Sequence, residues 1–224
     1  MKKRLITYLF SLLAATCLAQ GQEFQPEWNM GVNGGVTLSQ MRFNPTVSMG
    51  WLQQYAGGFT FRYISEKHFG VQAELNYAMR GWTEKEDSVA SYFNRYTRSL
   101  VYAEVPLMTH IYANLGKHAR VVFLAGPQIS FFLNQKVLEC FRDPNSRLRN
   151  NDYDYYDLKA ERFFDYGIVG GAGVELRTGI GHFVLDGRYF FGLSDTFGNV
   201  RTEGDYFEAS GNQVISIKLT YFFK

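Results

Sequence analysis

Ten ionisable residues recur along the chain in segments where polar and apolar side chains alternate. Five are acids and five are bases, and they are Arg62, Glu74, Arg80, Glu104, Asp165, Glu175, Arg177, Asp186, Arg188 and Lys218. Alternation places them on the face opposite the apolar side chains, so a closed sheet would bring them into one enclosed space. An unpaired charge there would cost several kcal/mol, and we therefore predict a paired ionic network with a structural role. A charged conduction path is the alternative function of the same residues.

Histidine placement bears on enzymatic function. Enzymes built on small barrels need a histidine beside a serine or an aspartate at the rim that carries the long loops. Here His68, His118 and His182 lie in or beside the shortest connections between predicted strands, and His110 lies near the same end. We therefore predict a non-enzymatic protein with no catalytic residues, and the sequence predicts no cofactor and no metal centre.

The longest predicted loop contains a second group of charges. Asp152, Asp154 and Asp157 have a spacing similar to that of calcium-loop carboxylates, but the glycine that an EF-hand needs does not follow. A solvated loop is the favoured interpretation, and a weak calcium or glycan contact is the alternative. Arg147 and Arg149, which precede these acids, could pair with them or contact lipid phosphates.

The ionisable residues lie on segments with strand periodicity. In the last segment Ile215, Ile217 and Leu219 alternate with Ser216 and Lys218, and period two places the two sets on opposite faces of a strand. Seven other segments behave in the same way. The eight predicted strands are 29–39, 56–63, 70–80, 96–112, 119–133, 162–177, 182–192 and 212–223.

The connections between these strands alternate in length. The long links are 40–55, 81–95, 134–161 and 193–211, and the short links are 64–69, 113–118 and 178–181. Strands that run up and down, with the variable connections at one end, are typical of a membrane barrel. The pattern predicts an eight-stranded antiparallel up-and-down transmembrane β-barrel with short periplasmic turns and long extracellular loops. Eight strands enclose a space just wide enough for side chains to fill.

Alternation alone does not say which face points inward, so the aromatic residues near the strand ends decide. The predicted low belt contains Tyr63, Phe69, Tyr112, Phe183, Tyr221 and Phe223, and the high belt contains Trp82, Tyr96, Phe131, Phe164 and Phe191. Two such belts are typical of the two membrane interfaces. We therefore expect the apolar face to point outward into lipid. A soluble exported barrel that binds a small apolar ligand, with its apolar face inward, is the alternative.

The N-terminus has the features of an export signal. Met1-Lys2-Lys3-Arg4 is basic, residues 5–16 are apolar, and small residues stand at the positions that a signal peptidase reads, which predicts a signal peptide over 1–19 and a barrel domain over 20–224. Removing the three basic residues leaves 20 bases against 21 acids, so nucleic acid is not an expected partner. Cys17 leaves with the leader, and Cys140 alone cannot form an internal disulfide.

Two prolines fall inside adjacent predicted strands. Pro106 and Pro127 lie roughly opposite each other across the 113–118 turn, and each lacks a backbone donor for the ladder. We expect a bulge or a local kink at that level.

Several short sequence motifs are similar to those of a known family. They are GVNGGVTLS at 31–39, QAELNY at 72–77 with RG at 80–81, YAEVPL at 102–107, AGPQ at 125–128, DYG at 165–167 through GAGVE at 171–175, and GRY at 187–189 with GL at 192–193. In this order they resemble the PorT-like outer-membrane β-barrel family, and they span nearly all of the chain after the leader. Both prolines belong to these motifs.

The resemblance implies an integral protein of the cell outer membrane. The namesake of the family is linked to type IX protein secretion, so the resemblance suggests an accessory role in secretion or in the envelope. Expected partners are outer-membrane lipid, the barrel-insertion machinery that reads the aromatic C-terminus, and a protein or glycan bound through the long loops. We expect a monomer, and a narrow passive channel is the alternative function.

Overall fold

The computed structural model describes residues 24–44, 49–84, 95–141, 163–195 and 209–224. The predicted signal peptide lies outside these residues. In the described part of the chain, no helix is long and apolar enough to cross a membrane.

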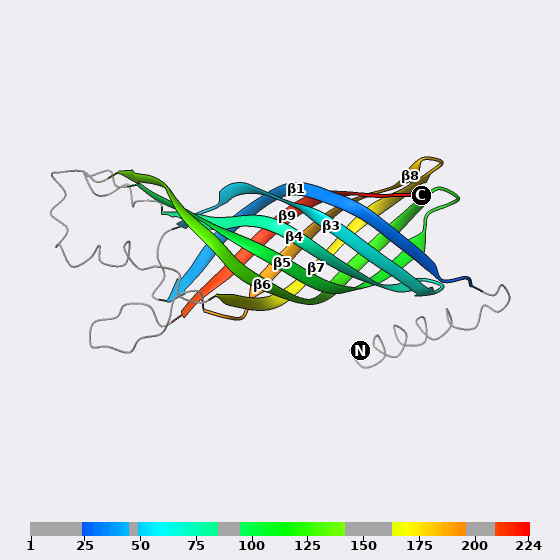
Figure 1. Ribbon diagram of the computed structural model, residues 1–224, viewed down its shortest axis with the longest axis horizontal. Coiled ribbons are helices and arrows are strands. Elements are labelled where there is room, and N and C mark those ends of the chain that lie inside the picture. The colour runs from blue at the N-terminus through cyan, green and yellow to red at the C-terminus, as the bar shows by residue number, and fades with distance from the viewer. Residues whose placement is uncertain (1–23, 45–48, 85–94, 142–162, 196–208) are drawn as a thin grey trace, which may run out of the picture.

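Eight long strands form a closed antiparallel barrel, as the sequence predicts (Figure 1). They are β1 (Glu27–Asn44), β3 (Leu52–Glu66), β4 (Phe69–Glu84), β5 (Arg95–Asn114), β6 (Ala119–Phe141), β7 (Phe164–Thr178), β8 (Gly181–Gly192) and β9 (Ala209–Phe222). The two-residue β2 (Met49–Gly50) pairs with the far end of β4. Each long strand pairs with the next, and β9 pairs with β1 to close the sheet.

The two ends of the barrel differ in their connections. Three tight connections join β3 to β4, β5 to β6 and β7 to β8 at one end, where β1 also begins and β9 ends (Figure 1). We refer to this as the short-turn end. Gly116 lies in one of these turns with a φ of 84°, a left-handed conformation that favours glycine. The other four connections all leave from the opposite end, the long-link end.

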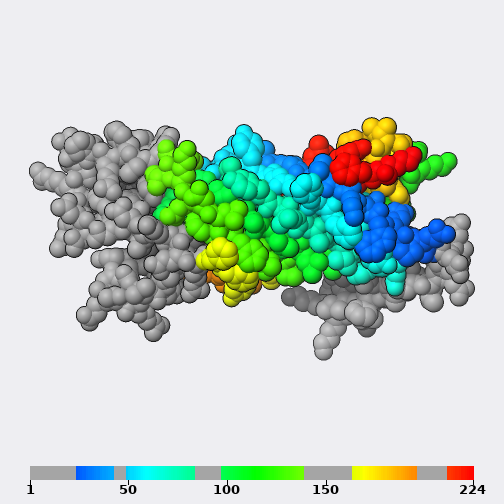
Figure 2. All heavy atoms as spheres, viewed as in Figure 1, coloured from blue at the N-terminus to red at the C-terminus, as the bar shows by residue number. Residues whose placement is uncertain are grey.

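The apolar side chains point outward and the polar side chains point inward, as the alternation predicts. In β9 the exposed fractions of Ile217 and Leu219 are 58% and 53%, whereas those of Lys218 and Thr220 are 4% and 1%. The same division holds along β3 to β8, and the outer side chains of β3 to β6 cover the wall that Figure 2 turns to the viewer. A soluble barrel would have the opposite arrangement, because water rather than lipid would surround it.

The strands are longer at the long-link end than the sequence predicts. β1 continues from Ser39 to Asn44, and β6 continues from Leu133 to Phe141. The register of β5 against β6 shifts between Thr97 and Arg98 and again between Val101 and Tyr102. Each shift breaks the period of two, so the alternation stops before the strand does.

Two residues of the predicted aromatic belts are placed wrongly. Trp82 and Tyr112 are each only 3% exposed and face the interior. Trp82 is two residues from the inward Arg80, and Tyr112 is two residues from the inward His110. Side chains two residues apart on a strand lie on the same face, so both point inward. On the outer surface at the short-turn end, Trp28 stacks on Tyr63 with ring centroids 4.1 Å apart.

The prolines interrupt the ladder without a bulge. Pairing of β5 with β6 stops after Pro106 and Gln128 and resumes at Thr109 and Ala125 in unchanged register. Pairing of β4 with β5 has a gap at the same level, whereas the β6–β7 ladder continues through Pro127. The missing donors therefore open a local gap in the ladder. Of the two expected outcomes, a bulge or a local kink, the bulge is wrong, because the register is unchanged across the prolines.

Candidate functional site in the charged interior

Inward side chains from seven of the eight long strands, β3 to β9, form three polar clusters inside the barrel. The central cluster is Glu74, Asp186, Arg188 and Lys218, the long-link-end cluster is Arg80, Glu104 and Asp165, and the short-turn-end cluster is Arg62, His110, Arg120 and Glu175. All of these side chains are buried. Apolar residues fill the space around them, including Met108, Leu124, Val169, Phe190 and Val214 as one group.

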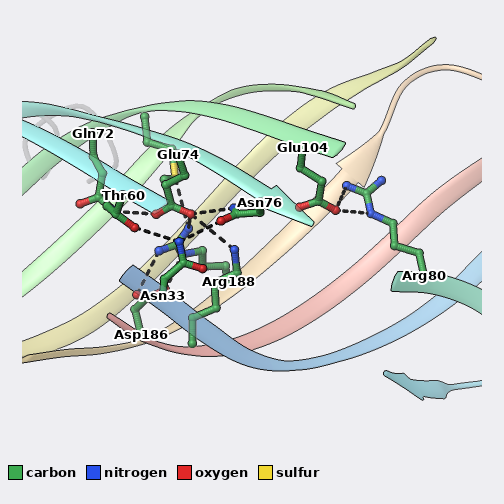
Figure 3. Close-up of polar contacts among 11 residues, drawn as sticks. Asn33, Thr60, Gln72, Glu74, Asn76, Arg80, Glu104, Asp186 and Arg188 are labelled. Atoms are coloured by element: carbon green, nitrogen blue, oxygen red, sulfur yellow. Dashed lines mark hydrogen bonds and ion pairs between the residues drawn. The ribbon is translucent and has the colours of Figure 1, made fainter. Parts of the chain in front are cut away.

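In the central cluster, two acids face two bases. Figure 3 shows Glu74, Asp186 and Arg188 among them. Arg188 Nη1 donates to Glu74 Oε2 at 2.8 Å, and its Nε and Nη2 donate to the two carboxylate oxygens of Asp186. Lys218 Nζ lies 3.4 Å from the same Glu74 oxygen. The four charges cancel, which is the arrangement that offsets the cost of burying them.

Neutral amides complete the coordination of Glu74. Gln72 donates to Oε1 at 2.7 Å and Asn76 donates to Oε2 at 3.0 Å, while Asn33 on β1 donates to the Asn76 side-chain oxygen at 2.8 Å (Figure 3). The carboxylate therefore accepts from four side chains, and no buried acid in this cluster is left without donors.

Glycines on β7 make room for these long side chains. Gly171 and Gly173 pair in register with Arg188 and Asp186. A Cβ added to Gly171 would lie 2.8 Å from Arg188 Cγ, and one added to Gly173 would lie 2.6 Å from Asp186 Cβ. Because these two positions have no side chain, Arg188 and Asp186 can lie directly against the backbone of β7.

The long-link-end cluster is built around Arg80. Its Nε donates to Glu104 at 2.7 Å and its Nη1 donates to Asp165 at 3.0 Å, while Nη2 lies 3.2 Å from the Ser130 hydroxyl. The Asn212 amide donates to Asp165 at 3.1 Å, and the Ser194 hydroxyl also donates to this carboxylate. Asp165 is thus held by Arg80 and by two neutral donors.

The short-turn-end cluster contains one acid and two arginines. Arg62 donates two hydrogen bonds to Glu175, of 2.8 and 3.3 Å, and its guanidinium lies 4.0 Å from the Phe222 ring centroid. Arg120 donates from Nε to Asn114 at 3.0 Å and lies 4.2 Å from the ring centroid of Tyr112. An apolar cap of Ile64, Tyr112, Val122, Val184 and Phe222 surrounds this region, and Phe24 packs against the cap.

Nine of the ten predicted network residues lie in the three clusters. Arg177 does not, because its side chain is 29% exposed at the mouth of the short-turn end, where it pairs with Glu27 at 3.1 Å. Arg120 and His110 belong to the interior but were absent from the predicted network. His110 is an even number of residues from the inward Glu104 on β5, and Arg120 is an even number from the inward Ser130 on β6, so this spacing was the signal that could have found them.

The loop residues singled out from the sequence lie outside the described residues. They are Arg147, Arg149, Asp152, Asp154 and Asp157.

The polar chemistry of the interior is that of paired ions. Among the described residues, no three His, Cys, Asp or Glu side chains come together as a metal site requires. His68 and His118 lie in the short turns, and His182 begins β8 at the same end. Within the described chain, histidine is therefore concentrated at the short-turn end.

Comparison with known proteins places this barrel in a family. The family described as "Outer membrane protein beta-barrel domain" matches residues 19–198. Among curated proteins, no sequence matches the chain.

The solved structures that resemble this barrel in fold include three outer-membrane proteins. Ail, the attachment invasion locus protein of Yersinia pestis, has a TM-score of 0.41 and 12% identity over 88% of this chain and 99% of its own. OprG from Pseudomonas aeruginosa has a TM-score of 0.46 and 9% identity over 87% and 93%. Neisserial surface protein A has a TM-score of 0.43 and 10% identity over 88% and 99%.

Proposed function

Because the chain belongs to the outer membrane protein β-barrel domain family, we propose that this integral outer-membrane barrel is a non-enzymatic, non-conducting stem that presents its long links to a protein or glycan partner. The observation that carries the proposal is the filled interior. Every long strand contributes a polar side chain to interlocked contacts there, so a passing solute would have to break buried ion pairs.

The four long links support the interaction part of the proposal. They all leave from one end of the barrel, and the β5–β6 hairpin extends that end, since β7 pairs with β6 only as far as Phe131. On the extension, Leu133, Val137 and Leu138 are 45–51% exposed. Loops on a rigid scaffold are a common place for recognition.

Planar-bilayer recordings test the closed interior. We expect the purified barrel to give no stepwise conductance above that of protein-free bilayers. Regular single-channel steps would support the alternative function, a narrow passive channel, and would refute the stem.

Loop replacement tests the interaction. Residues 142–162 would be replaced by a short Gly/Ser link, with the same replacement of 196–208 as the matched control, because both leave the strand ends intact. A partner captured by crosslinking on intact cells should be lost with one replacement and retained with the other. If neither replacement alters the captured partner, neither of these two links is the interaction surface.

The PorT-like motifs in the sequence extend the proposal to an accessory role in protein secretion. These motifs lie mostly on strands that build the barrel, and the link to secretion comes from the namesake of the PorT-like family. Deleting the gene and measuring export of type IX cargo would test the role, and normal export in the deletion strain would exclude it.

A further inference from the structure

The short-turn-end cluster is the one of the three in which bases outnumber acids. The central cluster has two of each, and the long-link-end cluster has one base, Arg80, and two acids. Its buried cations are Arg62 and Arg120, and its buried anion is Glu175. The nearby pair of Arg177 and Glu27 is neutral as a whole. The cluster therefore carries one surplus positive charge, because Glu175 lies opposite Arg120 in the β6–β7 register but receives its arginine hydrogen bonds from Arg62.

The buried atoms without hydrogen-bond partners at this end are mainly nitrogens that donate. In the described part of the barrel, Arg62 Nε, Arg120 Nη1 and Asn29 Nδ2 have no acceptor, and the side chains are 0%, 9% and 7% exposed. Asn29 pairs with Arg62 in the β1–β3 register, so their Cα atoms face each other across two strands.

His110 adds a fourth donor, because its neighbour fixes its tautomer. Its Nε2 lies 3.2 Å from Arg62 Nη1, and a guanidinium can only donate, so Nε2 must accept. The proton of the neutral ring then resides on Nδ1, which has no partner among the described residues and belongs to a side chain only 1% exposed. Buried donors normally find an acceptor, and an ion or an ordered water is the usual one when protein atoms do not supply it.

We propose that the short-turn-end cluster is a binding site for a small monovalent anion such as chloride. The anion accepts from Arg62, Arg120 and His110 and neutralises the surplus charge that Glu175 leaves. It reaches the site from the short-turn end, where His182 and Arg177 are only half-buried. The site holds the two arginines in place beside the apolar cap, and it is distinct from the long links at the other end.

Thermal unfolding at constant ionic strength tests the site. Chloride would be exchanged stepwise for gluconate, an anion too large for a packed interior, with the purified barrel in a neutral detergent. We expect the unfolding midpoint of the wild type to rise with chloride, because a ligand that binds only the folded state stabilises it by mass action. An unchanged midpoint across the series would overturn the proposal.

Variants separate the site from a general salt effect. Arg120→Gln should weaken the apparent chloride affinity about tenfold or more, as the loss of one charge-assisted hydrogen bond implies. Lys117→Gln, which removes an exposed charge from the adjacent turn, should keep the wild-type response. Equal chloride dependence in all three proteins would show that water, rather than an anion, satisfies these donors.

A second variant tests the same site in case Arg120→Gln does not fold. His110→Phe keeps a ring against Tyr112, whose centroid lies 5.6 Å away, but removes the Nδ1 donor. Its chloride response should also fall, with heat-modifiable gel mobility as the check on folding. In bromide-soaked crystals, an anomalous peak beside Arg62 and Arg120 would support the site, and a peak confined to the protein surface would contradict it.

Discussion

The central cluster and the short-turn-end cluster both combine carboxylates with basic side chains, but their net charges differ. In the central cluster Glu74 and Asp186 balance Arg188 and Lys218, and amides satisfy the remaining carboxylate lone pairs. At the short-turn end, a single Glu175 faces Arg62 and Arg120, and four buried donors find no acceptor among the residues that the structure describes. The difference indicates that one cluster is complete in itself, whereas the other is completed by something from outside the chain.

The largest expected effect is the loss of a base from the balanced cluster. Arg188→Gln would leave Glu74 and Asp186 with Lys218 alone, and breaking a buried pair in this way costs about 3–5 kcal/mol. Urea unfolding in lipid vesicles would measure the free energy of unfolding. A loss below 1 kcal/mol, by the approximate scale for exposed pairs, would mean that water enters the interior and that the cluster is not sealed.

A charge on the outer face provides the next contrast. Ile217→Arg places a cation among lipid tails without any partner, and we expect a loss of about 2–4 kcal/mol near the bilayer midplane. Phe223→Arg, beyond the end of β9, is the control and should cost about 0–1 kcal/mol, as expected near the interface. Equal costs at the two positions would argue against the assignment of the outer face to lipid. Cysteine labelling of positions 217 and 218 gives an independent check.

Packing around the central cluster gives a smaller effect. Gly173→Ala would put a methyl group 2.6 Å from Asp186 Cβ, and overpacking of this kind costs about 1–3 kcal/mol. The matched control is Gly170→Ala, where the nearest atom to an added Cβ is 3.9 Å away. If both variants unfold at the same urea concentration, the wall has enough freedom to move away, and the close contact does not define the cluster.

Removing the surplus arginine should cost less than removing a balanced one. In chloride-free gluconate, Arg120→Gln loses the hydrogen bond to Asn114, which is worth about 1 kcal/mol, but relieves an unbalanced charge. We therefore expect the free energy of unfolding to change by about 1 kcal/mol or less. A loss as large as that of Arg188→Gln would remove the distinction between the two clusters.

The smallest effect is expected at the mouth. Arg177→Gln removes an ion pair with Glu27 that is partly open to solvent, and such pairs contribute about 0.2–1 kcal/mol. The difference in urea midpoint from the wild type should shrink further in high salt, since screening weakens exposed pairs. An effect that persists in high salt would place Arg177 with the interior clusters after all.

The sequence by itself determined the barrel and the face of each side chain. Period two is a local property of a strand, so Glu74, Arg188 and Lys218 could be assigned to one face without knowing their neighbours. The links showed which strand ends lie together, because short connections force adjacent antiparallel strands. The same spacing rule places Trp82 and Tyr112 inside, since each lies two residues from an inward side chain.

Only the tertiary structure decided which charges meet. Arg62 and Glu175 are far apart in the chain and come together because closure of the barrel brings β3 and β7 across one interior. The tight β7–β8 turn sets the register that places Gly171 and Gly173 beside Arg188 and Asp186, whereas closure brings Arg62 to Glu175, which already lies opposite Arg120. Charge balance depends on all the side chains that enclose one volume, so an alternating pattern could predict the inward charges but not which cluster has a surplus.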